Sequence, residues 1–181
     1  HAPYFENVSY QVQSAEHTSF AEQSFDLITV AQAIHWFNFD RFYAEVNRTL
    51  KSDGVLAVIG YGLIQLQHPE LQACIERLYF KTLKGYWDAE RCYIDEAYQT
   101  IPFPYEEIPM PELSMSFQWS ADQLLDYFNT WSALKHYRLK NADDPLYELK
   151  VFFALDDHVS QIFEFTFPIF VRLGRLAVSV H

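Results

Sequence analysis

The spacing of hydrophobic and polar positions predicts strands and helices in alternation along the first third of the chain. Val8, Tyr10 and Val12 alternate with polar residues, which is the period of a strand with one buried face. Residues 25–33 are almost all apolar, and so are residues 55–59, as is typical of strands that are covered on both faces. These three segments are therefore predicted to be strands.

An amphipathic helix is predicted between the second and the third of these strands. Asn38 precedes it and is a residue type that caps helix N-termini well. The stretch from Lys51 to Gly54 predicts the end of the helix and a glycine turn. Strand, helix and strand in this order form a βαβ unit, so residues 1–62 are predicted to be α/β with a parallel sheet. The apolar stripe of the helix consists of Phe39, Phe42, Tyr43, Val46 and Leu50.

The rest of the chain has a different texture. Pro69 suits the first turn of a helix. Residues 85–111 are aromatic, dotted with proline and irregular, which is typical of a lid. Residues 112–119 and 161–173 alternate with period two and predict two further strands.

The predicted organisation is one domain with three segments. Residues 1–62 form the α/β core, and residues 63–111 form a helix and an aromatic lid or insertion. Residues 112–181 form a terminal strand pair that encloses a helical insertion over residues 120–158. Ser120 and Gln123 have the spacing of a capping box and would open the first helix of that insertion.

Charge and cysteine content narrow the class of protein. The chain has 24 acidic and 13 basic residues and a formal net charge of -11, so nucleic acid and membranes are not expected as partners. No apolar run approaches the roughly 20 residues that span a bilayer, and there is no secretory leader, which favours a cytoplasmic protein. Cys74 and Cys92 are predicted to be two buried thiols, although one disulfide stays open. No metal site is predicted.

Candidate chemistry gathers where the predicted parallel strands end, because ligands of open α/β sheets bind beyond the carboxyl ends of the strands. Asp26 lies at the opposite end of its strand and is predicted to make only a structural hydrogen bond. Three clusters follow the three strands: Ser14-Ala15-Glu16, then Gln32-Ala33-Ile34-His35-Trp36, then Gly60-Tyr61-Gly62.

The segments SAE, SFDLITVAQAIHWF and FYAEVNRTLKSDGVLAVIGYG over residues 14–62 resemble class I methyltransferases that use S-adenosylmethionine. The resemblance continues through YWDAER, FPYEEI, DQLLDYFNTWSALKHYR and FPIFVRLGRL, so it covers most of the chain. It is greatest to the small-molecule group that includes trans-aconitate methyltransferase. It implies a Rossmann-like sheet of parallel strands plus an antiparallel carboxyl-terminal strand pair, with a helical and aromatic cap.

The resemblance also implies which residues hold the cofactor. Ser14, Ala15 and Glu16 match the place where the family holds the adenine. A second group matches the segment beside the methionine moiety and the methyl donor, namely Gln32, Ala33, His35 and Trp36. A solvated carboxylate for Glu16 and core packing for His35 and Trp36 are the structural alternatives.

The sequence departs from the family pattern at its amino-terminal side. Such enzymes open with a strand, a glycine-rich loop for the methionine part of the cofactor and an acidic residue for the ribose, and no such opening is found here. The first two strands of the family sheet are therefore expected to be missing, and this fragment alone is expected to be inactive. Residues 8–13, the equivalent of the family's third strand, should then not pair with residues 25–31. Residues 25–31 and 55–59 should be parallel neighbours, with 161–173 antiparallel beside the latter and 112–119 at the far edge.

The predicted function is transfer of a methyl group from S-adenosylmethionine to a small-molecule acceptor, for which a carboxylate is one candidate. A carboxylate needs no general base, whereas a hydroxyl or amine would make His35 the first base to test, with Tyr61 beside it as a second catalytic candidate. The acceptor pocket is predicted from residues of the cap: Trp87, Arg91, Tyr127, Trp131 and Arg138. Either arginine could instead be an ordinary surface residue. A non-catalytic interaction subunit and a nicotinamide-dependent oxidoreductase are the alternatives, and a homodimer is left open.

Overall fold

The computed structural model describes residues 5–155 and 161–176. The chain forms two compact units, each of which is described by itself. The first unit comprises His1–Ile59, Pro102–Met110 and Val171–His181, and the second comprises Gly60–Ile101 and Pro111–Phe170. The predicted division of the chain at residues 62 and 111 remains a prediction.

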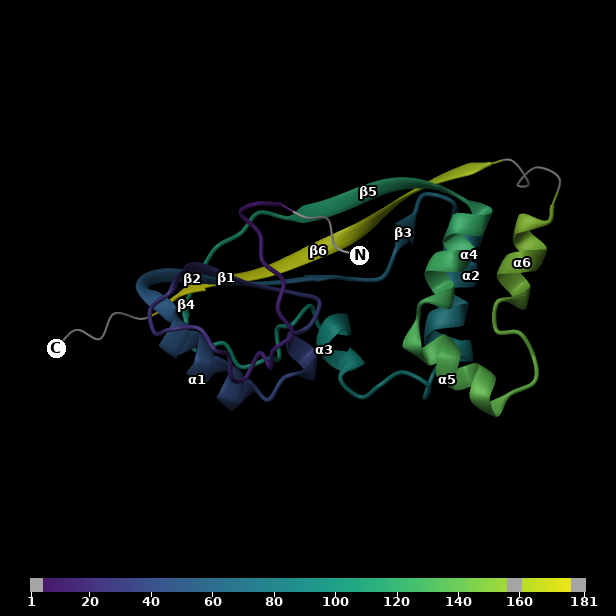
Figure 1. Ribbon diagram of the computed structural model, residues 1–181. Helices are drawn as coiled ribbons and strands as arrows, with labels where there is room; N and C mark the ends of the chain where they lie inside the picture. The colour runs from purple at the N-terminus through teal and green to yellow at the C-terminus, as the bar shows by residue number, and fades with distance from the viewer. Residues whose placement is uncertain (1–4, 156–160, 177–181) are drawn as a thin grey trace. The chain divides into compact units, whose positions relative to one another are not determined.

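The first unit contains the predicted βαβ element (Figure 1). Strand β1 (Phe25–Ala31) is followed by a short 3₁₀ helix η1 (Ile34–Trp36), helix α1 (Phe39–Thr49) and strand β2 (Leu50–Tyr61). β1 and β2 are parallel, with Leu27 opposite Val55 and Ala31 opposite Ile59. The prediction that these two segments are parallel neighbours is therefore confirmed.

The sequence features of α1 act as predicted. The Asn38 side chain accepts a hydrogen bond from the backbone N–H of Arg41 at 3.1 Å and so caps the helix. Of the five predicted stripe residues, Phe42, Tyr43 and Val46 are buried on α1, and Leu50 is buried but is the first residue of β2. Burial of this stripe against the sheet is what stabilises the helix, since isolated helices of this length are marginal in water.

Two expectations for the first unit were wrong. Residues 8–13 form no strand, and Val8, Tyr10 and Val12 are 41%, 61% and 105% exposed, because no neighbouring strand in the described residues supplies a ladder of hydrogen bonds. They accordingly do not pair with β1, as expected. The stretch from Lys51 to Gly54 is not a turn but lies within β2, where the register with β1 shifts between Phe25 and Leu27.

The remaining strand of the first unit joins its later segments. β4 (Glu106–Ile108) pairs antiparallel with the end of strand β6 (Ile162–Arg175), from Arg175 to Leu173. Arg172 of β6 is buried, forms an ion pair with Glu107 and places its guanidinium carbon 4.5 Å from the centroid of the Phe103 ring. Such a stacked arginine stabilises the strand pair through both charge and packing.

The second unit is built on the amino-terminal half of β6. This half of β6 pairs antiparallel with β3 (Gln65–Leu66) and, along its length, with β5 (Leu113–Ser120). The overall strand order is β1-β2-β6-β3, with β5 bonded to β6 alone among the described strands. The expected places of residues 161–173 beside β2 and of residues 112–119 at an edge are confirmed, and so is the predicted α/β fold.

The second unit contains six helical segments among its described residues (Figure 1). They are α2 (Pro69–Arg77), a π-helix η2 (Leu78–Thr82), α3 (Arg91–Asp95), α4 (Ala121–Asn129), α5 (Ser132–Lys140) and α6 (Tyr147–Phe153). Pro69 begins α2 as predicted, and Ser120 and Gln123 form the predicted capping box of α4. The predicted irregular segment 85–111 was wrong in part, since it includes α3 and β4. The hydrophobic core of the second unit joins these helices to the buried face of β6 through Phe128, Leu134, Phe163 and Phe165.

The cysteines and the helix lengths add two observations. Both cysteines are free; Cys74 is buried, whereas Cys92 is exposed, so the expectation of two buried thiols was wrong for Cys92. Cys92 is the second residue of α3, which has only five residues. A helix this short buries few of its own side chains. None of the helices in the described ranges is both long enough and apolar enough to cross a membrane.

Candidate cofactor and acceptor sites

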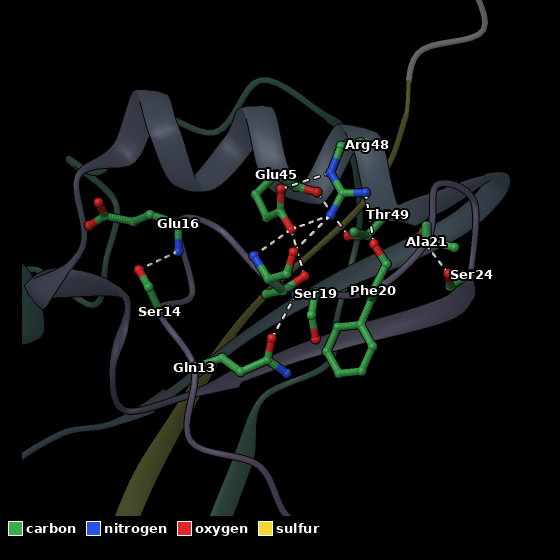
Figure 2. Close-up of polar contacts among 11 residues, drawn as sticks. Gln13, Ser14, Glu16, Ser19, Phe20, Ala21, Ser24, Glu45, Arg48 and Thr49 are labelled. Atoms are coloured by element: carbon green, nitrogen blue, oxygen red, sulfur yellow. Dashed lines mark hydrogen bonds and ion pairs between the residues drawn. The ribbon is translucent and has the colours of Figure 1, made fainter.

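The loop before β1 is fixed to helix α1 by a carboxylate and an arginine (Figure 2). Glu45 accepts the backbone N–H of Thr18 at 2.8 Å and its hydroxyl at 2.6 Å, and it forms an ion pair with Arg48 at 2.6 Å. Arg48 also donates to the carbonyl of Phe20 at 2.8 Å. The hydrogen bond from Arg48, followed by those from Thr18, holds the pKa of Glu45 at about 2 despite its burial. The loop that carries the predicted adenine-binding residues is thus held by charge-assisted bonds.

The residues predicted to hold the adenine lie at the start of this loop. The backbone N–H of Glu16 donates to the Ser14 hydroxyl at 3.2 Å, which closes a tight local turn (Figure 2). One carboxylate oxygen of Glu16 accepts the backbone N–H of Asn38 at 2.8 Å, at the N-terminus of α1. Ala15 and Glu16 are half-buried. The second carboxylate oxygen has no hydrogen-bond partner among the described residues, so it could accept from an exocyclic amine.

The second predicted cluster follows β1 directly. Gln32 has a positive φ of 51°, which is uncommon for a residue other than glycine, and its N–H donates to the carbonyl of Ile59 at 2.8 Å. His35 is 5% exposed and its ring lies 4.9 Å from that of Trp36, which is 57% exposed. A large exposed indole at a strand's carboxyl end is available to a ligand, whereas the imidazole is packed inside.

An apolar cavity of about 390 Å³ lies on one face of β1 in the first unit. Its walls include Ala15 from the loop, Ala33 after β1 and the side chains of Leu27, Val30, Phe42 and Val46. Two residues of the predicted cofactor set therefore border the same hollow. Leu27 is 54% exposed in this face of the described chain.

The aromatic residues predicted for the acceptor pocket form one continuous cluster in the second unit. The Phe167 ring lies 5.4 Å from Tyr61 and 5.4 Å from Tyr127. Trp131 lies 5.8 Å from Tyr127 and 5.3 Å from Trp87. Tyr61 stands at the carboxyl end of β2, so the cluster extends from a strand end to the cap, where the sheet rule expects a ligand.

The hydroxyl of Tyr127 is a neutral donor in this cluster. Burial raises the pKa of Tyr127 to about 12, although a hydrogen bond from Trp131 and the charge of Arg91 act in the opposite direction. A phenol that stays protonated near pH 7 can donate a hydrogen bond to an acceptor molecule but does not act as a base.

Arg91 lies at the end of the aromatic cluster. Its guanidinium carbon is 4.8 Å from the centroid of the Trp87 ring and 5.2 Å from that of Tyr79. Its Nε donates to the Tyr79 hydroxyl at 2.7 Å, and the same nitrogen is 3.5 Å from Asp95. The other predicted arginine is placed differently, since Arg138 pairs with Asp144 at 3.7 Å and its side chain is 41% exposed.

Two residues of this site, Tyr79 and Asp95, were not predicted from the sequence. The Tyr79 ring packs against Trp87 in a tilted arrangement with ring centroids 4.6 Å apart, and its hydroxyl donates to Asp95 at 2.5 Å. The four-residue spacing of Arg91 and Asp95 on a helix was a signal for their pairing. No pattern pointed to Tyr79, because it comes from a separate helix.

The segment that carries Trp87 and Arg91 is fastened to helix α5. The Ser132 hydroxyl donates to Asp88 at 2.8 Å. His136 Nδ1 and the Tyr86 carbonyl are 2.9 Å apart, and the Asn141 amide donates to the Tyr86 hydroxyl at 2.8 Å. The cap is therefore ordered by side-chain hydrogen bonds on both sides of Trp87.

Comparison with known proteins identifies the family of the chain. Residues 1–58 match the sequence profile described as "Methyltransferase domain". A Dictyostelium discoideum protein, provisionally named a methyltransferase, is 32% identical over 176 residues, which is 94% of this chain and 67% of that protein. This chain belongs to the class I S-adenosylmethionine-dependent methyltransferases. A solved structure, provisionally named a type II methyltransferase from Anaeromyxobacter dehalogenans, is 36% identical with a TM-score of 0.86 and covers 96% of this chain and 74% of that one.

Membership of this methyltransferase family settles the class of reaction and cofactor. The chain is a methyltransferase that uses S-adenosylmethionine, and the oxidoreductase and non-catalytic alternatives are set aside. The residues present fit part of that cofactor, because Glu16 has a spare carboxylate oxygen and Trp36 an exposed ring. Family membership does not identify the acceptor.

A second cavity, of about 500 Å³, lies in the second unit. Its walls come from the loop after β2, from α2, η2 and α3, and from β6, and they include Tyr79, Phe80, Asp95 and Phe170. No group of three or more His, Cys, Asp or Glu side chains in the described part of the chain is arranged to hold a metal ion.

Proposed function

We propose that this methyltransferase transfers its methyl group to a carboxylate of a small organic acid. The observation that carries the proposal is the state of Arg91. Its Nε is engaged by Tyr79, while its two terminal nitrogens have no hydrogen-bond partner among the described residues. A guanidinium presents two parallel N–H groups to a carboxylate, and such bidentate pairs are among the stronger hydrogen bonds in proteins.

The aromatic cluster supports a small and partly apolar acceptor. Tyr61, Trp87, Tyr127 and Trp131 offer ring faces and two phenolic hydroxyls around one region. Aromatic side chains supply shape and apolar contact, and a few polar groups among them fix the orientation of a ligand.

An acidic acceptor makes modest chemical demands on the chain. Bound S-adenosylmethionine supplies an activated methyl group on a sulfonium. A carboxylate is already ionised near pH 7, so no side chain needs to remove a proton from it. Orientation and exclusion of water are the tasks left, and orientation alone can contribute roughly 7–11 kcal/mol to lowering a barrier. Arg91 would orient the acid, and the rings would exclude water.

The predicted roles of the first unit are part of the same proposal. Ser14, Ala15 and Glu16 would hold the adenine, and Gln32, Ala33 and Trp36 would border the methyl donor. His35 is proposed to support Trp36 by packing rather than to act as a base, because it is only 5% exposed.

The proposal is tested by incubating the full-length protein with methyl-labelled S-adenosylmethionine and three acids, succinate, citrate and benzoate, together with their amides. We expect label in the acids alone, and we expect alkali to release it as methanol, because methyl esters are hydrolysed whereas methyl groups on nitrogen or carbon are not. Label that survives alkali would contradict the proposal.

Arg91→Lys should lower kcat/KM about 100-fold, since lysine cannot offer the paired donors. Arg138→Lys is the matched control and should stay near the unmodified protein.

A further inference from the structure

The hydroxyl of Tyr79 links two groups of opposite charge at the acceptor site. It accepts the Nε–H of Arg91 at 2.7 Å and donates its own proton to Asp95 at 2.5 Å. Tyr79 is 3% exposed, and burial raises its pKa well above the usual range, so the phenol stays protonated and keeps both hydrogen bonds. The orientation of the guanidinium is thereby tied to two side chains from different helices.

Two aromatic rings lie against the same guanidinium. Arg91 lies against the rings of Trp87 and Tyr79, whose own centroids are 4.6 Å apart. Its side chain is 21% exposed, so it is neither free in solvent nor sealed in the core. A stacked and hydrogen-bonded arginine loses less conformational entropy when it binds a ligand than a free one does.

Unusual backbone conformations hold both partners in place. Tyr79 lies in the π-helix η2, where the N–H of Leu83 donates to the carbonyl of Leu78 at 2.9 Å. π-Helical turns are rare and are frequent at functional sites. Helix α3 carries Arg91 and Asp95, and two residues of the turn that follows it, Ala97 and Tyr98, have φ values of 50° and 60°. Such conformations persist only where the surroundings enforce them.

We propose that Tyr79 and Asp95 are positioning residues, which hold Arg91 as a clamp for one carboxylate of the acceptor. The inference builds on the proposed function, which supplies an acidic acceptor. Arg91 and Asp95 together carry no net charge, which suits a monoanionic carboxylate better than a doubly charged phosphate. The two terminal nitrogens of Arg91 provide the bidentate contact, and Tyr79 and Asp95 act on the ligand only through Arg91.

The test is calorimetric binding of succinate, citrate and benzoate to the full-length protein, with their amides and inorganic phosphate as comparison ligands. We expect at least one acid to bind, its amide not to bind measurably, and phosphate to bind more weakly than the acid. Tyr79→Phe keeps the ring and removes only the hydroxyl, and we expect it and Asp95→Asn to weaken acid binding about tenfold. In kinetics, the KM for the acid should rise while kcat and the KM for S-adenosylmethionine stay within about twofold.

The second unit contains a matched control. The Tyr137 hydroxyl donates to Asp143 at 2.7 Å, which is the same kind of bond away from any guanidinium stack. Tyr137→Phe and Asp143→Asn should leave acid binding unchanged. Tyr79→Phe should melt within a few degrees of the unmodified protein, which separates positioning from loss of structure.

Some outcomes would overturn the clamp. These are the absence of binding for all three acids, equal binding of acid and amide, and unchanged acid affinity in both Tyr79→Phe and Asp95→Asn. The clamp and the proposed function fail separately. If acids bind with the expected variant pattern but gain no alkali-labile methyl group, the clamp stands and methyl transfer to a carboxylate does not.

Discussion

The carboxylate of Glu45 receives both the backbone N–H and the hydroxyl of Thr18, 27 residues earlier in the chain. Glu45 is 7% exposed and also pairs with Arg48, so its contacts with Thr18 are charge-assisted hydrogen bonds that are shielded from solvent. It ties the loop with the proposed adenine contacts to the helix that follows β1. We expect Glu45→Gln to lower the free energy of unfolding by about 2 kcal/mol, which is typical when a bond to a charged group is lost.

Urea denaturation of the full-length protein would measure that loss. Asp26→Asn is the control, because Asp26 pairs with Lys51 at 2.8 Å on the surface, with a side chain that is 83% exposed. Exposed ion pairs contribute only about 0–1 kcal/mol. Equal destabilisation by the two variants would show that burial does not strengthen the Glu45 contacts.

Acid should weaken the same loop. The Arg48 hydrogen bond holds the pKa of Glu45 at about 2, below its ordinary value of 4.5. A carboxyl group with a lowered pKa contributes its full stability above pH 4.5 and loses that stability as the pH falls to about 2. Hydrogen exchange of the Thr18 amide should therefore accelerate, relative to its intrinsic rate, across this range. Glu45→Gln should lack this pH dependence, and an identical profile in the variant would refute the assignment.

Gly60 is predicted to be intolerant of any side chain. A Cβ atom there would lie 2.1 Å from the ring of Phe170 and 2.8 Å from that of Tyr98. Overpacking of this kind costs about 1–3 kcal/mol, so Gly60→Ala should lower the melting temperature by several degrees. Gly85 is the control for the effect of backbone conformation. Its φ is +83°, but a Cβ atom there would meet nothing within 4 Å, so no steric clash is added. Gly85→Ala should cost only about 1 kcal/mol, from the backbone alone. A smaller effect at Gly60 than at Gly85 would contradict the close packing.

Trp36 is predicted to matter for the cofactor and not for stability. Trp36 is 57% exposed after the carboxyl end of β1, so truncation leaves no cavity. We expect Trp36→Ala to weaken binding of S-adenosylhomocysteine to the full-length protein about tenfold, as measured by calorimetry, at an unchanged melting temperature. Leu139→Ala is the control, since Leu139 is 84% exposed on α5. Unaltered affinity in Trp36→Ala would remove Trp36 from the proposed site.

The local elements were determined by the sequence itself. The apolar runs of β1 and β2, the stripe of α1, the Asn38 cap and the Ser120–Gln123 capping box each depend on neighbours a few residues away. Short-range periodicity and capping chemistry are therefore enough to predict them. The place of Gln32 to Trp36 after β1 followed from the general rule for α/β sheets, whereas the strand expected before Ser14 does not form. The roles of these residues remain a proposal.

Only the tertiary structure decided what depends on contacts between distant segments. Val8, Tyr10 and Val12 have the pattern of a strand, yet a strand forms only where a neighbour completes its hydrogen bonds. The sequence proposes Arg91 and Arg138 equally for the acceptor pocket, and only their partners distinguish them. Arg91 contacts two aromatic rings, a phenol and a carboxylate, whereas Arg138 contacts one partly exposed carboxylate. Tyr79 joins the site because a π-helical turn from another segment places its hydroxyl beside Arg91. Such long-range contacts leave no local period in the sequence, so only the folded chain shows them.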